Sequence, residues 1–159
     1  MNKETFELEV GDKTLKITLN DWAVQAGGSC LVQYGETVVL ANATMSEQNR
    51  EGIDFFPLTV EYEEKFYAAG KIYGSRFLKR ESRPTDEAIL TSRMIDRAIR
   101  PLFPKDFKKE VQIICTCLSW DGQNDPDFAA FIAASFALAI ASFIEILLPL
   151  KKATTNASR

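Results

Sequence analysis

The chain has 159 residues, of which 46% are hydrophobic and 26% charged, enough for one globular domain with a buried core but not for two. Its formal net charge of -3 excludes a protein that coats nucleic acid with a basic surface, so any contact with nucleic acid must be local. The chain contains no histidine. This excludes Ser-His, Cys-His and histidine-metal mechanisms and leaves carboxylates, lysine or a metal held by oxygen.

The three cysteines, Cys30, Cys115 and Cys117, lie in apolar stretches without the spacing of a zinc site or a disulfide framework. They are expected to be reduced thiols in a core. The first twenty residues contain no apolar run of the signal-peptide type, so export is not indicated. Together these features favour a cytoplasmic location.

The first half of the chain is predicted to be an antiparallel meander. Apolar and polar residues alternate over residues 5–19 around Gly11-Asp12, a pattern typical of a hairpin with one buried face. Residues 29–35 and 36–45 are predicted to be two further strands. A polar loop follows, and then a strand over residues 55–62.

The second half is predicted to be mainly helical, which makes the fold class mixed α/β. An exposed irregular segment over residues 65–82 precedes a helix that begins after Pro84 and runs to about Arg100. One face of this helix, opposite the face that carries its arginines, is expected to be apolar, through Ala88, Ile95, Ile99 and Leu102. Residues 110–120 have the composition of a buried strand, and an apolar helix is expected from about Asp127.

The apolar helix needs a test for membrane insertion, because residues 128–144 contain seventeen positions without a charge. Its alanine and serine content, and its acidic start at Asp125 and Asp127, favour a helix buried in a protein core. A transmembrane segment is the alternative.

Basic residues are concentrated between Arg76 and Arg100. This segment contains seven basic and four acidic residues, although the chain is negative overall. At helical spacing, Arg93, Arg97 and Arg100 fall on one side of the predicted helix. Arginine binds phosphate well, because its planar guanidinium donates two parallel hydrogen bonds and keeps its charge. A solvated helix face paired with nearby acids is the alternative.

The loop before this helix places Phe77 and Leu78 among cations. Single-stranded nucleic acid is held by this combination, since cations follow the backbone and aromatic rings stack on bases. Phe77 packing inward beside ordinary surface cations is the alternative reading.

Four runs in order resemble the bacterial polynucleotide phosphorylase family: DFFPLTVEY from Asp54, YAAGKI from Tyr67, GSRFLKRESRPT from Gly74 and MIDRAIRPLFP from Met94. The resemblance covers about residues 5–142. It implies the first ribonuclease PH-like domain, a mixed β/α sandwich, here truncated at its C-terminus. It also implies phosphorolytic 3′-to-5′ degradation of single-stranded RNA and mRNA to nucleoside diphosphates with inorganic phosphate, Mg²⁺ as cofactor, a homotrimer around a channel, and participation in an RNA-degradation complex.

The resemblance implies that RNA is bound by Phe77, Lys79, Arg80, Arg83, Arg93, Arg97 and Arg100. The family has two phenylalanines and two arginines in the loop, and this chain departs from that pattern at Leu78 and Lys79. The catalytic and metal-binding groups of the family belong to its second domain. We therefore expect no catalytic residue and no metal site in this chain, and no activity of the chain alone.

The sequence divides into an incomplete first domain over residues 1–142 and a divergent tail over residues 143–159, which a frame-shift could explain. A non-enzymatic RNA-binding or assembly module is the alternative function. A second domain with paired aspartates in the same open reading frame would favour the enzyme.

Overall fold

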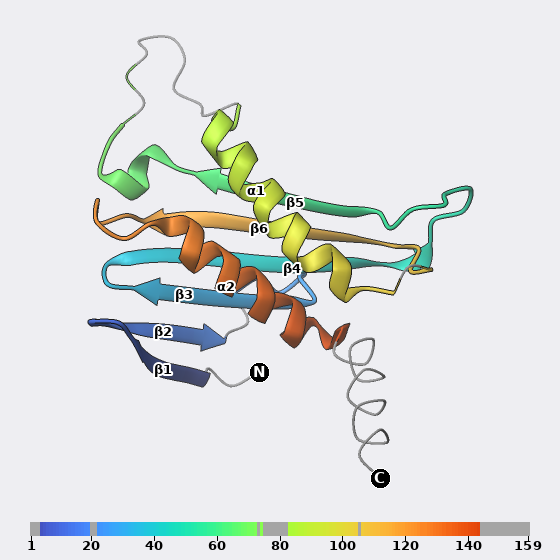
Figure 1. Cartoon of the computed structure of the whole chain (residues 1–159), viewed down its shortest axis with the longest axis horizontal. Helices are drawn as coiled ribbons and strands as arrows, with labels where there is room; N and C mark the ends of the chain where they lie inside the picture. Colours follow the sequence, from blue (N-terminus) through green and yellow to red (C-terminus); the bar gives the residue numbers. More distant parts are fainter. Residues whose placement is uncertain (1–3, 20–21, 73, 75–82, 105, 144–159) are drawn as a thin grey trace.

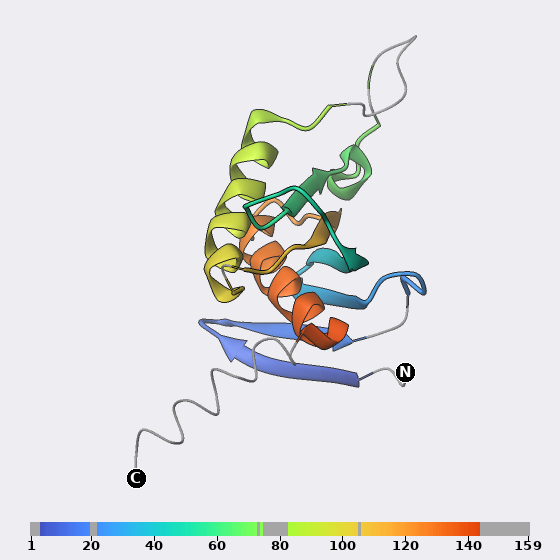
Figure 2. The ribbon, with the colours of Figure 1, turned by 90° about the vertical axis from the view of Figure 1, so that its right-hand side faces the viewer.

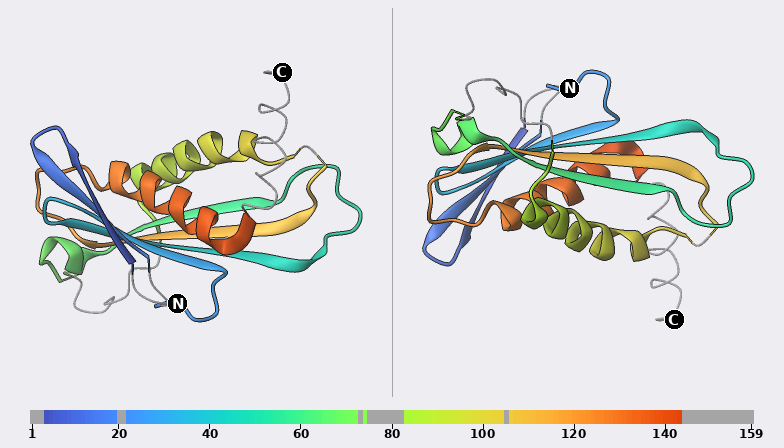
Figure 3. Two further views of the ribbon diagram at one scale, coloured as in Figure 1. Left: turned by 90° about the horizontal axis from the view of Figure 1, so that it is seen from below. Right: turned by 90° about the horizontal axis from the view of Figure 1, so that it is seen from above.

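The computed structural model describes residues 4–19, 22–72, 74, 83–104 and 106–143. Over these residues six strands form a sheet of order β1-β2-β3-β4-β6-β5 (Figure 1). The two α-helices, α1 and α2, both lie on one face of this sheet (Figures 2 and 3). The predicted mixed α/β class is confirmed, and the core lies between the helices and the sheet.

Strands β1 to β4 form the predicted antiparallel meander, with bounds Glu4–Val10, Lys13–Leu19, Gly28–Tyr34 and Thr37–Asn49. The first turn is made by Gly11, whose φ of 68° is a left-handed conformation that glycine adopts without steric cost. Strand β4 continues past the predicted end at residue 45, because its end pairs with the start of β6 after a register shift. Residues that were expected to form a loop are therefore part of β4.

Strand β5 (Leu58–Glu64) lies at the edge of the sheet and runs parallel to β6 (Lys109–Ser119), which separates it from β4. It begins three residues later than predicted. The segment before it instead turns Phe56 inward, where its ring packs 4.6 Å from that of Phe103 and 5.4 Å from that of Phe107.

Helix α1 (Asp86–Ile99) connects β5 to β6, and its N-terminus is capped by Thr85, whose hydroxyl oxygen accepts a hydrogen bond from the amide of Ala88. The predicted apolar face is buried at Ala88, Ile95 and Ile99. It is wrong at Leu102, which is 50% exposed. The chain passes there into a 3₁₀ turn, η2 (Arg100–Leu102), whose tighter winding changes the direction of the side chains.

Helix α2 (Pro126–Leu138) continues into a π-helical turn, η3 (Ala139–Phe143). It packs on β3 and β4, and the predicted core helix is confirmed because five of its alanines are buried. They are Ala129, Ala130, Ala133, Ala134 and Ala137. No helix in the described part of the chain has the length and apolar character to cross a membrane.

Candidate RNA-binding site

The basic loop that was predicted to grip RNA is mostly outside the described residues. Phe77, Lys79 and Arg80 lie outside the described residues, so their roles stay predictions. Arg83 is described, and it lies exposed two residues before the cap of α1. A cation at this position can approach a ligand from solvent without first breaking a buried contact.

Arg93 and Arg97 occupy the exposed side of α1, one turn apart, as the helical spacing predicted. Two guanidinium groups at this separation can contact neighbouring phosphates of one strand. Leu90 and Met94 are exposed on the same helix. This side of α1 therefore combines cations with apolar surface.

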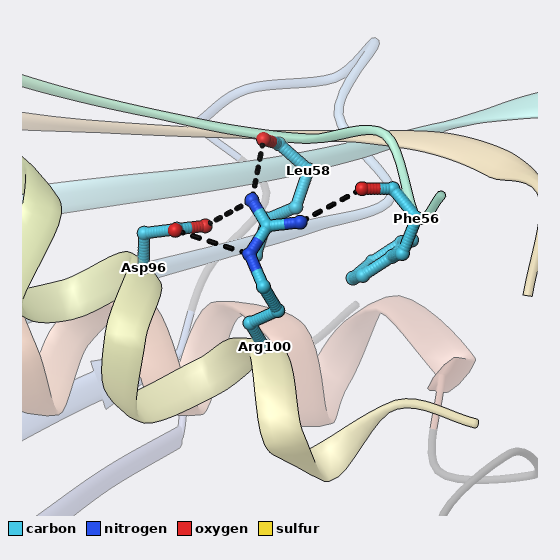
Figure 4. Close-up of polar contacts among 4 residues, drawn as sticks. All are labelled: Phe56, Leu58, Asp96 and Arg100. Atoms are coloured by element: carbon cyan, nitrogen blue, oxygen red, sulfur yellow. Dashed lines mark hydrogen bonds and ion pairs between the residues drawn. The ribbon is translucent and has the colours of Figure 1, made fainter. Parts of the chain in front are cut away.

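Arg100 differs from the other two helix arginines, because its guanidinium binds within the fold (Figure 4). Nη1 donates to the carbonyl oxygen of Phe56 at 2.8 Å, and Nη2 donates to that of Leu58 at 3.2 Å. Nε and Nη2 also donate to the carboxylate of Asp96, at 3.1 and 2.7 Å. Arg100 thus joins the end of α1 to the start of β5, and its predicted contact with RNA is not tested by this geometry.

A pocket that the sequence did not reveal lies at the carboxyl ends of the parallel strands β5 and β6. Its volume is about 600 Å³. One wall is a 3₁₀ turn, η1 (Phe66–Ala69), and the other is the loop from Trp120 to Pro126 that enters α2. Three acids, Glu64, Glu87 and Asp125, line it together with Lys65 and Lys71. Their positions are too far apart in the sequence to form a recognisable motif.

Two carboxyl groups at this end of the sheet, Asp127 and Glu64, have raised pKa values. Burial raises the pKa of Asp127, and the nearby charge of Asp125 adds to this, although the Thr91 hydroxyl that donates to Asp127 at 2.8 Å opposes it. Burial also raises the pKa of Glu64, against a hydrogen bond from the hydroxyl of Thr85 at 3.2 Å. The buried hydroxyl of Tyr62 lies beside Asp127. This end of the sheet is therefore rich in hydrogen-bond acceptors.

The turn that forms one wall of the pocket is held by Asp121. Its carboxylate accepts hydrogen bonds from the amides of Asn124, Gln123 and Glu36, and these bonds hold its pKa well below the usual range. The Asn124 side chain amide also donates to Asp121, and its oxygen accepts from Nζ of Lys13 at 2.7 Å. The turn is thereby tied to two hairpins of the sheet.

The described residues offer no metal centre, since no group of three or more histidine, cysteine, aspartate or glutamate side chains is placed to hold an ion. They do not fit the Mg²⁺ that the resemblance implies. The cysteines are buried, and burial raises the pKa of Cys30 and Cys115 to about 12 and that of Cys117 to about 11. Such thiols are not thiolate nucleophiles at neutral pH.

Comparison with known proteins finds relatives that align with most of this chain. The chain is 54% identical over 137 residues to a polyribonucleotide nucleotidyltransferase of Heliobacterium modesticaldum, with 86% of this chain and 19% of the relative covered. It is 56% identical over 138 residues to one of Exiguobacterium sibiricum, with 87% and 18% covered. The chain spans about a fifth of the length of these relatives.

Solved structures share the fold. Rrp46 of rice (Oryza sativa) has a TM-score of 0.59 at 17% identity, with 80% of this chain and 55% of that chain covered. A chain of the Archaeoglobus fulgidus exosome with RNA bound to its active site has a TM-score of 0.58 at 25% identity, with 78% and 50% covered. The family model of ribonuclease PH, described as the 3′ exoribonuclease family, domain 1, matches residues 12–143. The chain therefore belongs to the 3′ exoribonuclease family, and it matches domain 1 of that family over these residues.

Proposed function

We propose that this chain is part of a phosphorolytic 3′-to-5′ exoribonuclease that degrades single-stranded RNA to nucleoside diphosphates with inorganic phosphate. Within that enzyme it supplies RNA contact and assembly surface, and it does not supply the reacting groups. The match to domain 1 of the family carries the proposal. The exposed Arg83, Arg93 and Arg97 support it, because they offer three cations on and just before α1 to the phosphates of RNA.

The complete enzyme is proposed to use Mg²⁺ and to work as a homotrimer in the cytoplasm, in association with an RNA-degradation complex. The relatives include a chain of an exosome with RNA at its active site, which supports both RNA as substrate and an assembled state. The metal and the phosphate are proposed for the complete enzyme, because the family resemblance implies them there.

The experiment that tests RNA contact compares the purified chain with the double variant Arg93→Ala/Arg97→Ala in binding of a single-stranded oligonucleotide at several salt concentrations. Each lost phosphate contact should reduce the slope of log affinity against log salt by about 0.7 for a single strand. We expect a loss of affinity of similar size for all sequences and a slope shallower by about 1.4. The backbone carries the same charge in every sequence.

The control variant is Arg50→Ala, which removes an exposed arginine paired with Glu110 at 3.8 Å, away from α1. It should leave affinity and slope near those of the unsubstituted chain. An effect of the control about half that of the double variant would mean that only total charge matters, because the control removes one charge and the double variant removes two. Release of nucleoside diphosphates from poly(A) by the chain alone, dependent on phosphate, would contradict the assignment of the reacting groups elsewhere.

A further inference from the structure

The pocket at the end of β5 and β6 occupies the position where α/β sheets commonly bind ligands. Ligands in such folds lie outside the carboxyl ends of parallel strands, where loops lead into helices. Here Glu64 ends β5, Ser119 ends β6, and both α1 and α2 begin beside the same space (Figure 1). The volume of about 600 Å³ is that of a small-molecule site.

An exposed tryptophan in the lining of the pocket is the first indication of the ligand. Trp120 lines the pocket and remains 44% exposed, although it follows a buried strand and its backbone amide is bonded to the carbonyl of Ala68. That backbone bond fixes the residue between β6 and η1. Nucleobases of single-stranded RNA stack on aromatic side chains held in this way.

The polar groups at the starts of α1 and α2, which form the inner end of the pocket, disfavour a phosphate there. Helix N-termini usually attract anions through free amides, but here Thr85 accepts from the amide of Ala88 and Asp125 accepts from that of Asp127. Glu87 and Asp127 add negative charge to the first turns. The inner end therefore presents acceptors and favours a neutral ligand that donates hydrogen bonds.

Two cations line the same pocket. Lys65 and Lys71 flank η1, and Lys65 pairs with Glu63 at 3.1 Å. A nucleotide can satisfy both kinds of group at once, with its phosphate toward the lysines and its base toward Glu64, Glu87 and Asp125. Adenine, cytosine and guanine carry an amino group that a carboxylate can accept from, whereas uracil does not.

We propose that this pocket is a nucleotide subsite that stacks a base on Trp120 and prefers bases with an exocyclic amino group. The base comes from a free nucleotide or from single-stranded RNA, and the second source rests on the function proposed above. Such a subsite would give the chain a base preference that phosphate contacts through Arg93 and Arg97 cannot provide.

Tryptophan fluorescence tests the proposal directly, because the chain has two tryptophans and Trp22→Phe leaves Trp120 as the reporter. The variant is titrated with AMP, CMP, UMP, inorganic phosphate, and oligomers of adenylate and uridylate. We expect quenching by AMP and CMP at concentrations at least fivefold lower than for UMP, and none by phosphate. Calorimetry on the unsubstituted chain gives the same comparison without any change at Trp22.

Glu87→Gln should reduce the preference for AMP over UMP to less than twofold, because the amide offers a donor where the carboxylate only accepts. Asp86→Asn is the matched control, since Asp86 is in the same first turn of α1 but does not line the pocket. It should keep the preference.

The outcomes separate the subsite from the proposed function. Equal quenching by AMP and UMP, or no quenching by any nucleotide while adenylate oligomers still bind through Arg93 and Arg97, overturns the subsite and leaves the function standing. Quenching by AMP without binding of any oligomer supports the subsite for free nucleotides and contradicts RNA as the ligand of this chain. Quenching by adenylate oligomers but not uridylate oligomers supports the RNA source.

Discussion

Among single residues, Arg100 shows how a basic side chain can be part of the fold. Its four hydrogen bonds connect the carbonyls of Phe56 and Leu58 with the carboxylate of Asp96. Its guanidinium also lies 5.7 Å from the centre of the Phe56 ring. Arg97, on the same helix, is exposed and has no such set of bonds among the residues described. The two arginines therefore separate a structural role from a surface role within one turn.

We expect Arg100→Ala to reduce the free energy of unfolding by about 1–3 kcal/mol, because two carbonyls lose a charged donor and the end of α1 loses its tie to β5. Arg97→Ala should change it by less than about 0.5 kcal/mol. Urea denaturation followed by circular dichroism gives both values. Arg100→Lys should fall between them, since one ammonium cannot reach all the acceptors of a planar fork. A loss at Arg97 as large as that at Arg100 would contradict this division.

At the scale of elements, α2 lies close to the sheet because its buried face is made of alanine and the strand beneath it begins with glycine. A Cβ on Gly28 would overlap the carbonyl oxygen of Ala137 and lie 2.8 Å from the amide nitrogen of Ala141. Both atoms belong to the backbone, so neither can move aside without shifting the helix. The separation of helix and sheet is thus fixed at one position.

Gly28→Ala should destabilise the fold by about 2 kcal/mol or more, because added volume in a packed interior forces the backbone to move. Gly74→Ala is the control, since a Cβ there meets no atom within 4 Å and the backbone has no left-handed φ. Thermal unfolding should show a lowered Tm for the first variant and little change for the second. A normal Tm for Gly28→Ala would mean that α2 is less tightly seated than the structure shows.

The local elements could be predicted from the sequence, because alternation, helix caps and glycine turns act over a few residues. The hairpin at Gly11, the start of α1 after Pro84 and the alanine helix are examples. The insertion of β6 between β4 and β5 could not be predicted, since no local pattern records which strand is a neighbour. The pocket was missed for the same reason, and helical spacing grouped Arg100 with Arg93 without showing its carbonyl partners.

Over the whole molecule, carboxylates with opposite pKa shifts make stability depend on pH in two ways. The lowered pKa of Asp121 adds stability above its unfolded pKa and loses it as pH falls. The raised pKa of Asp127 works in the other direction, so its contribution is present below the unfolded pKa and is lost as pH rises through the folded pKa. Asp125, Glu87, Glu64 and Tyr62 surround this second group.

Asp127→Asn should therefore gain stability relative to the unsubstituted chain as pH rises from below the unfolded pKa of Asp127 through its raised folded pKa, and then reach a plateau. The amide keeps an oxygen that accepts from the Thr91 hydroxyl but carries no buried charge. Urea denaturation at a series of pH values measures the difference. Asp12→Asn, in the exposed turn between β1 and β2, reports the effect of removing one charge from the surface. A stability difference between Asp127→Asn and the unsubstituted chain that stays constant with pH would contradict a destabilising charge on Asp127.

The position of β6 in the sheet has a consequence for the order in which the chain can fold on the ribosome. Strands β1 to β4 follow one another in sequence and in space, so they can pair as they emerge. Strand β5 is made next, but its neighbour in the sheet, β6, is made only after the whole of α1. Until β6 emerges, both β4 and β5 keep an open edge on the side where it will lie. The half of the sheet that carries the pocket therefore forms in a single late event, when β6 pairs with both β4 and β5.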